Sequence, residues 1–453
     1  MRVRSAIVGN RVEEMSDISR TSAVIVVLAL LIAGTLSRSQ LVANWIGVVA
    51  TIAVTGLTVF GLYYTDRLRV QLPTPLLFGI AGLFGIYLGH VLVGNFGSAS
   101  LAVWPFYTTF VAGTLLFVLP ALVPERTVFR IVSRFAVCVG LIGMFVVFVR
   151  PFTIPIVAIE LTTWHDKSAP FLPAEAAMRS VTANPNEAGI LFAVGAVAAI
   201  REWLDERTVV AKALAVLAIL SLYLSQSRGG FALFLISITL YPVFRYSKPH
   251  IGVKLLAFGL AGTVLFVFSR IGVLPSFGPL ERVPLTHRDD LWRGAVDALL
   301  SENAIRWLFG PGIIDTGEWI APYVDNEQVS GTPVHGAYFH FLRFGIVGAG
   351  IWLLTVWSSI LGEALNENQN HFALALSSGF GVLMIFEAVN VFDTRIGAIL
   401  MALSFGYLFA GVSRTIVIKR PTTGFRPIFE SGEKSNDFRS SQYRRSSTEE
   451  NRL

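Results

Sequence analysis

About twelve long apolar stretches follow one another along this chain of 453 residues, and they restrict it to one class of fold. A helix that crosses a bilayer needs about 20 largely apolar residues, because it must satisfy its own backbone polar groups. Only 15% of the residues are charged, whereas a soluble domain carries roughly 25%. We therefore expect an all-α polytopic membrane protein with spans near residues 22–36, 41–64, 74–94, 99–123, 128–149, 187–203, 208–224, 229–245, 251–269, 336–360, 371–391 and 395–413.

The positions of the basic residues predict how these spans are oriented. Lysine and arginine concentrate in the short cytoplasmic loops of membrane proteins. With twelve spans, the basic connections all fall on one side: Arg67 and Arg69; Arg126, Arg130 and Arg134; Arg201, Arg207 and Lys212; Arg245, Lys248 and Lys254. The membrane domain, residues 1–413, is thus expected in the cytoplasmic (inner) membrane with both termini in the cytoplasm.

The last forty residues differ in composition from the rest of the chain. Residues 414–453 hold nine Lys/Arg against five Asp/Glu and few apolar residues, which predicts a disordered basic tail on the cytoplasmic side. The net charge of +6 then reflects topology and contact with anionic lipid rather than nucleic-acid binding.

Two connections on the outer side are long, at about 150–186 and 270–335, and loops of this length usually have a role. In the larger one, Thr286 to Asn303 predicts an amphipathic helix capped by Thr286. Two acids in its first turn suit the helix dipole, and the chain breaks again at 310–312. The residues of its apolar stripe are Leu291, Ala295, Ala298 and Leu299. In the smaller loop, the apolar segment 154–161 is expected to lie on the membrane surface.

Three residues on the outer side could carry chemistry together: Arg228, Arg288 and His335. Two guanidiniums can hold a diphosphate through forked hydrogen bonds, and they stay charged at any working pH. A neutral imidazole can take a proton from an attacking hydroxyl, since its unperturbed pKa is near 6.5. Activity that depends on it should fall on the acidic side as the imidazole protonates.

Each of the three residues also has a purely structural explanation. Arg228 lies between two apolar segments, where it is equally well explained as a helix-end anchor whose charge reaches the interface. Arg288 precedes Asp289 and Asp290. Considered by itself, it is explained by an ion pair with one of them on a solvated helix. A single histidine at a helix start, such as His335, is more often a structural hydrogen-bonding residue. Their joint occurrence favours the functional interpretation.

Four local patterns resemble the O-antigen ligase/polymerase superfamily of bacterial cell-surface glycan assembly. They are Asn184-Pro185-Asn186, then Ser225-Gln226-Ser227-Arg228-Gly229-Gly230, then Arg288 with Leu291-Trp292 followed by Gly310-Pro311-Gly312, and finally Val334-His335-Gly336-Ala337-Tyr338. They cover roughly residues 184–350 in the family's order. Family members often have asparagine after the histidine of the last pattern, where this chain has Gly336.

The resemblance implies a membrane-embedded, metal-independent glycosyltransferase of the GT-C class. Such enzymes move a glycan from a polyprenyl-diphosphate carrier outside the cytoplasm onto an acceptor hydroxyl, in lipopolysaccharide and other polysaccharide biosynthesis. The family's essential arginines correspond to Arg228 and Arg288, and its essential histidine to His335. The acceptor, a lipid A-core, a growing glycan or a protein, stays open, and so does the choice between ligase and repeat-unit polymerase.

Further polar residues in or near the spans are candidates for substrate binding. Glu387, Asn390 and Asp393 are spaced three apart and are expected on one helix face, and Glu387 could instead only neutralise Arg343 or Arg395. Asn184 and Asn186 could bind the donor or cap the sixth helix. The remaining candidates for substrate binding are His90, Arg150, Arg343 and Arg395.

Two rival interpretations remain at this stage. A metal at His287, Asp289, Asp290 and Asp315 is less expected than helix capping by the acid pair, so neither metal nor other cofactor is predicted. A glycolipid transporter or flippase would bind diphosphate through the same arginines without breaking a bond. The lack of an internal repeat and the long outer loop argue against transport.

Overall fold

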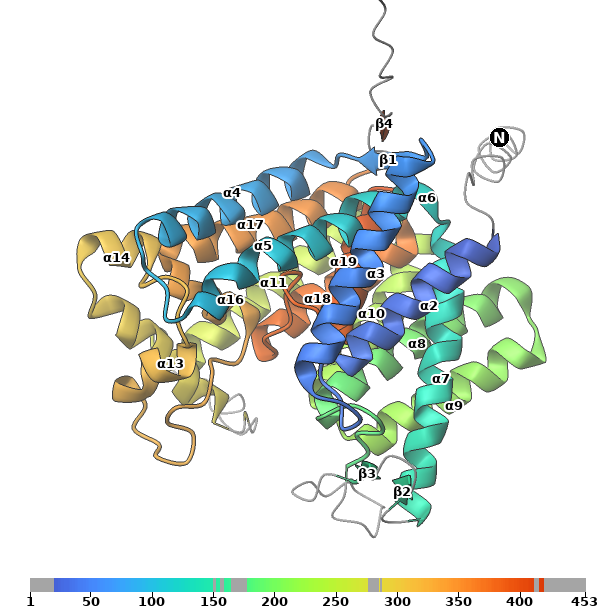
Figure 1. The fold of residues 1–453 in the computed structure, drawn as a ribbon, viewed down its shortest axis with the longest axis horizontal. Coiled ribbons are helices and arrows are strands. Elements are labelled where there is room, and N and C mark those ends of the chain that lie inside the picture. The colour runs from blue at the N-terminus through green and yellow to red at the C-terminus, as the bar shows by residue number, and fades with distance from the viewer. Residues whose placement is uncertain are drawn as a thin grey trace, which may run out of the picture. The chain divides into compact units, whose positions relative to one another are not determined.

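The computed structural model describes residues 20–149, 152–154, 159–163, 177–275, 285, 287–410 and 415–418. Within these ranges the chain is almost entirely helical, and its strands form two short antiparallel pairs (Figure 1). The protein is therefore all-α, as its composition predicts.

Each of the twelve apolar stretches contains a helix, and seven of the described segments are long and apolar enough to cross a membrane. They are α3 (Asn44–Tyr64), α4 (Thr74–Leu92), the continuous α5 (Ala99–Gly113), η1 (Thr114–Val118) and α6 (Leu119–Leu122), then α7 (Glu125–Val149), α10 (Arg228–Tyr246), α11 (Pro249–Arg270), and the continuous α16 (Ala337–His340), η3 (Phe341–Phe344) and α17 (Gly345–Ala364).

The other five helices fall short of that criterion by length or by charge. Four are apolar but shorter: α2 (Arg20–Leu36), α9 (Val209–Ser225), α18 (His371–Phe386) and α19 (Ile396–Leu408). The fifth, α8 (Pro185–Glu206), has 22 residues but carries acids in its first and last turns. Seven candidate spans are established by length and composition, and the count of twelve stays a prediction.

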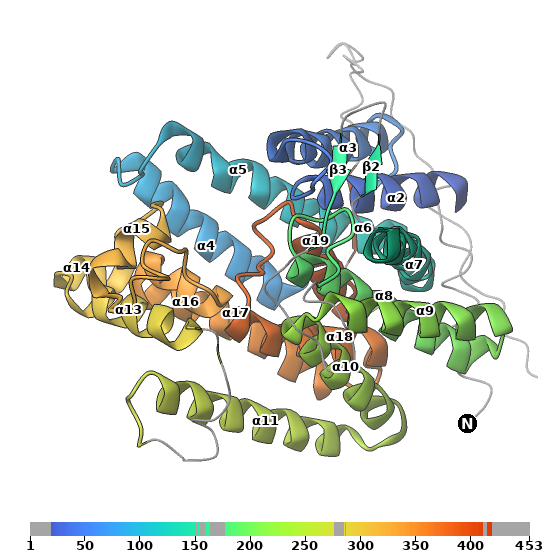
Figure 2. The same ribbon diagram turned by 90° about the horizontal axis from the view of Figure 1, so that it is seen from below.

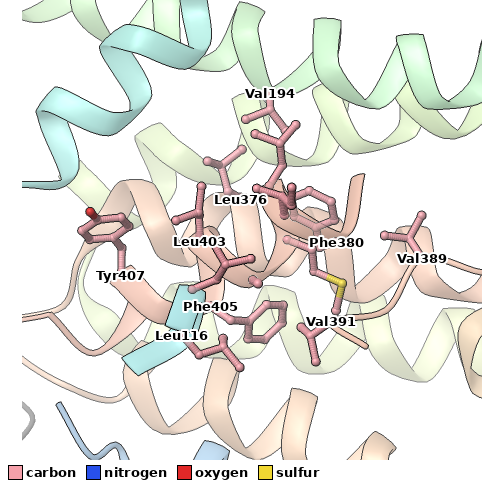
Figure 3. Close-up of a cluster of buried hydrophobic side chains, with 14 of the residues drawn as sticks. Leu116, Val194, Leu376, Phe380, Val389, Val391, Leu403, Phe405 and Tyr407 are labelled. Atoms are coloured by element: carbon pink, nitrogen blue, oxygen red, sulfur yellow. The ribbon is translucent and has the colours of Figure 1, made fainter. Parts of the chain in front are cut away.

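The core lies where α8, α18 and α19 meet. Every residue of α19 is buried, as are most of those in α8 and α18. Figure 3 shows Val194 of α8, Phe380 of α18 and Phe405 of α19 converging from these helices. By contrast, α11 runs along one edge of the bundle in Figure 2 and buries only Gly252, Leu256 and Ser269. Three helices outside the set of candidate spans thus form the centre around which those spans are arranged.

Two distant segments pair at one end of the bundle. Strand β1 (Leu68–Gln71), between α3 and α4, pairs antiparallel with β4 (Thr415–Ile418), which follows α19. The loop after the second predicted span and the start of the tail therefore share one side, as the basic residues predict. Disorder from residue 414 onward is wrong for Thr415–Ile418, because these four residues form a strand. The rest of the tail lies outside the described residues.

The larger outer loop contains the amphipathic helix that its sequence predicts. Helix α13 (Arg288–Leu300) has Asp289 and Asp290 in its first turn and buries the predicted apolar stripe. It is followed by α14 (Ala304–Phe309), α15 (Thr316–Ile320) and the 3-10 turn η2 (Ala321–Tyr323), with the predicted break at Gly310. Thr286, the predicted cap, lies outside the described residues.

The described part of the smaller outer loop contains two strands. Strand β2 (Phe152–Ile154) pairs antiparallel with β3 (Ile159–Leu161), and Phe152 is opposite Leu161.

One prediction about a helix face is wrong. Helix α18 ends at Phe386, and Glu387 is already extended, with φ −120° and ψ 141°. Glu387, Asn390 and Asp393 therefore lie on the non-helical segment between α18 and α19, not on one face of a helix. Their side chains reach different neighbours as a result.

Candidate functional site

Glycines around Arg228 determine where the start of α10 lies. A Cβ atom on Gly230 would come within 2.7 Å of the backbone of Gly189 in α8. A Cβ on Gly229 would lie 3.1 Å from Oε1 of Glu387 and 2.9 Å from Leu383 in α18. Small residues allow such close helix approach in membranes. The two glycines thus seat the first turn of α10 between α8 and α18, with the exposed Arg228 at its start, next to Glu387.

Arg288 occupies the equivalent position on the outer loop, as the first residue of α13. Its Nη2 donates to Oε1 of Glu387 over 2.6 Å, and the two side chains are only 17% and 9% exposed. The predicted pairing of Arg288 with Asp289 or Asp290 is absent from the described contacts, because Asp289 instead accepts from Arg270 over 2.6 Å. Glu387 therefore connects the starts of two arginine-bearing helices.

The backbone around His335 is fixed from two directions. Its carbonyl oxygen accepts from Nε1 of the buried Trp292 over 2.9 Å, and the amide of Ala337 donates to the carbonyl oxygen of Glu387 over 3.0 Å. Between them, Gly336 has φ +91°, and a Cβ there would lie 2.3 Å from the carbonyl oxygen of Ile385. This geometry gives a physical reason for glycine where the resembling family often has asparagine.

The imidazole of His335 is kept neutral by its surroundings. Burial, together with the positive charges of Arg288, Arg38 and Arg395, lowers the pKa of His335 to about 4, and burial contributes most. A neutral ring can accept a proton, but positive neighbours weaken it as a base. An ordinary pKa near 6.5 predicts that activity falls as the pH drops through that value. With the lowered pKa of His335, we expect the fall in activity at a lower pH.

A second cluster of charges, around Glu187, also acts on His335. Arg395, which directly precedes α19, donates to Oε1 of Glu187 over 3.2 Å, and it also pairs with Asp393. Arg38, which follows α2, lies 4.0 Å from the same Glu187 oxygen. Glu187 is 5% exposed and stands in the first turn of α8. The predicted Arg395–Glu387 pair is thus replaced by Arg395–Glu187.

Four helices begin among these charged residues: α8, α10, α13 and α19. The amino-terminal end of a helix carries a partial positive charge and unpaired N–H groups, which makes it favourable for anions. Arg38, Arg228, Arg288 and Arg395 lie here with the carboxylates of Glu187, Glu387 and Asp393, and Asp289 and Asp290 stand in the first turn of α13. The site therefore combines four arginines and four helix starts, and a polyanion could bind them in place of the carboxylates.

Two of the predicted substrate-binding residues instead hold the outer loop. His90 Nε2 lies 2.8 Å from the carbonyl oxygen of Phe309. Arg343 is 6% exposed, donates to the carbonyl oxygen of Ile314 over 3.3 Å and lies over the rings of Trp104 and Phe344. Both fasten the segment that follows α14 to the bundle.

The asparagines behave mainly as capping residues. Asn184 accepts from the amides of Asn186 and Glu187 over 2.8 and 3.0 Å, which caps α8. Asn186 follows within the first turn of that helix. Arg150 lies outside the described residues. In the described part of the chain, no three or more His, Cys, Asp or Glu side chains come together as a metal site.

Arg38 is the site residue that the sequence reasoning missed. It follows the first apolar stretch, in a short connection on the predicted outer side, and this departure from the basic residues of the short inner connections was the available signal. Glu187 and Asp393 were noticed only as helix-start and helix-face residues. The pairing of Asp393 with Arg395 is local, two residues apart, whereas that of Glu187 depends on a packing of α8 against α19 that local sequence does not contain.

No protein-family model matches this chain, and no curated protein matches it either.

Proposed function

We propose that this chain transfers a glycan from a polyprenyl-diphosphate carrier onto an acceptor hydroxyl. One observation carries the proposal: Arg228 and Arg288 begin two helices that meet at Glu387, beside the turn that presents His335. The family resemblance and the arginines at four helix starts support the same reaction.

In this proposal the arginines hold the diphosphate. Glu387 is the counter-ion of Arg288 when no donor is bound, so the diphosphate competes with it for the guanidinium. Forked hydrogen bonds from Arg228 and Arg288 then neutralise the charge that grows on the leaving diphosphate. Arg38 and Arg395, whose charges also act on His335, add longer-range attraction.

His335 takes the proton of the acceptor. The acceptor oxygen attacks the anomeric carbon, the bond from that carbon to the diphosphate oxygen breaks, and the lipid diphosphate leaves with the electron pair. The hydroxyl proton passes to the imidazole. Because a bound diphosphate offsets the nearby positive charges, it raises the pKa of His335 and makes the ring a stronger base only when donor is present.

An apolar groove of about 370 Å³ supports binding of the isoprenoid chain. It is lined from α10, α11, α17 and α18 by residues that include Leu235, Leu256, Trp357 and Val382. Val382 directly precedes Leu383, whose side chain touches the position of Gly229. The groove therefore begins within one helical turn of the proposed diphosphate site.

The proposed location is the inner membrane, with both termini in the cytoplasm and the site facing outward. The same transfer serves ligation to a lipid acceptor and polymerisation of repeat units in lipopolysaccharide or other polysaccharide assembly. The deciding test is turnover of a polyprenyl-diphosphate glycan by the purified protein in lipid nanodiscs, with lipid A-core, free glycan and hydroxylated peptide as acceptors.

The expected result is release of polyprenyl diphosphate together with a glycosylated acceptor. Arg228→Ala and Arg288→Ala should abolish both, whereas Arg306→Ala, an exposed arginine on α14, should not. Movement of intact donor across the membrane of proteoliposomes, without bond cleavage, would contradict the transferase and establish the transporter alternative.

A further inference from the structure

Helix α14 carries an apolar surface that the rest of the described protein leaves uncovered. None of its residues is buried, and the exposed fractions reach 74% for Ile305 and 46% for Phe309. The other large apolar side chains on this surface are Leu300, Trp307 and Leu308, all classed as exposed. Neighbouring exposed apolar side chains of this size usually mark an interaction surface.

The carboxyl-terminal end of α14 is fixed beside the end of α4 and the start of α17 (Figure 1). The carbonyl oxygen of Phe309 contacts His90, which lies two residues from the end of α4. A Cβ on Gly345, the first residue of α17, would lie 2.1 Å from the carbonyl oxygen of Leu308. Because Gly345 lies within the continuous candidate span Ala337–Ala364, α14 packs beside the end of one candidate span and against another.

The apolar surface of α14 continues into the lipid-facing surface of those spans. Leu92 and Val93, at the end of α4, are 76% and 70% exposed, and Ile346 at the start of α17 is 41% exposed. In a membrane protein such side chains on candidate spans face lipid. We therefore expect the lipid that covers these side chains to cover the exposed apolar side chains of α14 as well.

Polar and aromatic residues are distributed on α14 as the membrane interface requires. Asn303 caps the helix, and Arg306 pairs over 3.4 Å with Glu302, which precedes the cap. Trp307 and Phe309 follow in the last turn. Tryptophan is enriched at the headgroup level of membrane proteins, where its ring contacts both apolar and polar surroundings.

We infer that α14 is an interfacial helix whose apolar residues insert into the outer leaflet of the bilayer. Its partner is the lipid surface itself. Because α13 directly precedes α14 in the outer loop, this contact holds the carboxyl-terminal end of α13 near the membrane surface. The inference stands on the geometry of α14 and does not depend on which reaction the protein performs.

A fluorescence experiment in lipid nanodiscs tests this contact. An environment-sensitive probe (NBD) is attached to Ile305→Cys in a Cys138→Ser background, because Cys138 is the only cysteine of the chain and is exposed. Matched probes go to Glu327→Cys, exposed in the outer loop, and to Phe78→Cys, 72% exposed within α4. Quenching is measured with iodide in water and with lipids that carry a nitroxide near the headgroup.

Iodide should quench the probe at position 305 several-fold less than the probe at position 327. The nitroxide lipid should quench the probe at position 305 more than the probe at position 327. Equal iodide quenching at 305 and 327 would overturn the inference. Shielding that grows with protein concentration in detergent would also overturn it, because a second copy would then cover the surface. Trp307→Cys provides an independent labelling position if the variant at 305 does not fold.

Discussion

Arg288 and Glu387 are 99 positions apart in sequence, yet Nη2 of one lies 2.6 Å from Oε1 of the other. Neither side chain is more than 17% exposed, so each charge depends on the other when no ligand is present. An anion that enters this site must exchange with a carboxylate, not simply add to a free guanidinium. The pair therefore influences both affinity for the donor and the order in which the site assembles.

Substitution of the two arginines should affect transfer more than expression. Arg288→Ala removes a guanidinium from the leaving group, and loss of one such contact costs about 10²–10³ in rate. Arg228→Lys keeps the charge but loses the fork, so it should remain far below the wild type. Initial rates with saturating acceptor measure both effects, and Arg306→Ala is the control. Near-normal transfer by both Arg228→Ala and Arg288→Ala would contradict the proposal that these two arginines hold the diphosphate.

Neutralising Glu387 should increase affinity for the diphosphate. Glu387→Gln keeps the size of the side chain but removes the charge that competes for Arg288, so pyrophosphate should bind more tightly. Isothermal titration of pyrophosphate against the purified protein measures this change, with Glu318→Gln, an exposed position on α15, as the control. Weaker binding would instead mean that Glu387 serves mainly to orient Arg288.

The arginine–glutamate pair also illustrates the limit of sequence reasoning. Twelve helical segments, the helix of the outer loop and its apolar stripe were predictable, because hydrophobic periodicity is a local property. The contact between Arg288 and Glu387 was not, because it needs α18 to end at Phe386 and the following residues to extend. Nothing in the apolar run from residue 371 signals that end.

The residues that begin α8 and α19 give a second example. Asn184 was interpretable as a cap from its own neighbours, and it is one. Glu187 and Arg395 pair across 208 positions, so neither sequence neighbourhood contains the partner. Local chemistry thus indicates which residues are unusual, while the packing of the bundle decides which of them meet.

Gly230 should be intolerant of any side chain. Its missing Cβ would lie 2.7 Å from the backbone carbonyl group of Gly189, and backbone atoms cannot yield as a flexible side chain does. Overpacking of this kind typically costs about 1–3 kcal/mol. Gly230→Ala should therefore lower the unfolding temperature in detergent, whereas Gly262→Ala on α11, with no atom within 4 Å of its Cβ, should not. Equal melting of the two variants would show that α8 and α10 are not so closely packed.

Cysteine labelling should establish the proposed topology. In a cysteine-free background, Ser168→Cys and Asp325→Cys should react with an impermeant maleimide from the outside of intact cells. Ser440→Cys should react only after permeabilisation, since the basic connections predict a cytoplasmic tail. The reverse pattern would place the arginines and His335 in the cytoplasm and would exclude transfer on the outer face.

The pH dependence of transfer should separate His335 in the free protein from His335 with donor bound. Its pKa is lowered to about 4, below that of an ordinary histidine, so the ring stays neutral from pH 9 down to 5 and protonates only as the pH falls through about 4. The profile of kcat/KM reports the free protein and should stay flat on the acidic side until pH nears 4. The diphosphate offsets the charges of Arg288, Arg38 and Arg395, so the acidic limb of kcat should lie at higher pH.

The His335→Ala variant makes this test specific to His335. Loss of a general base typically lowers the rate by about 10²–10⁴, so transfer should fall by that order and lose its acidic limb, while donor binding survives on the arginines. His250→Ala, an exposed histidine near the start of α11, is the matched control and should leave both profiles unchanged. A wild-type kcat/KM profile that falls near pH 6.5 would mean that His335 is not held among the arginines. If the His335→Ala variant transferred the glycan at the normal rate, the general base would instead be Glu387 or the substrate itself.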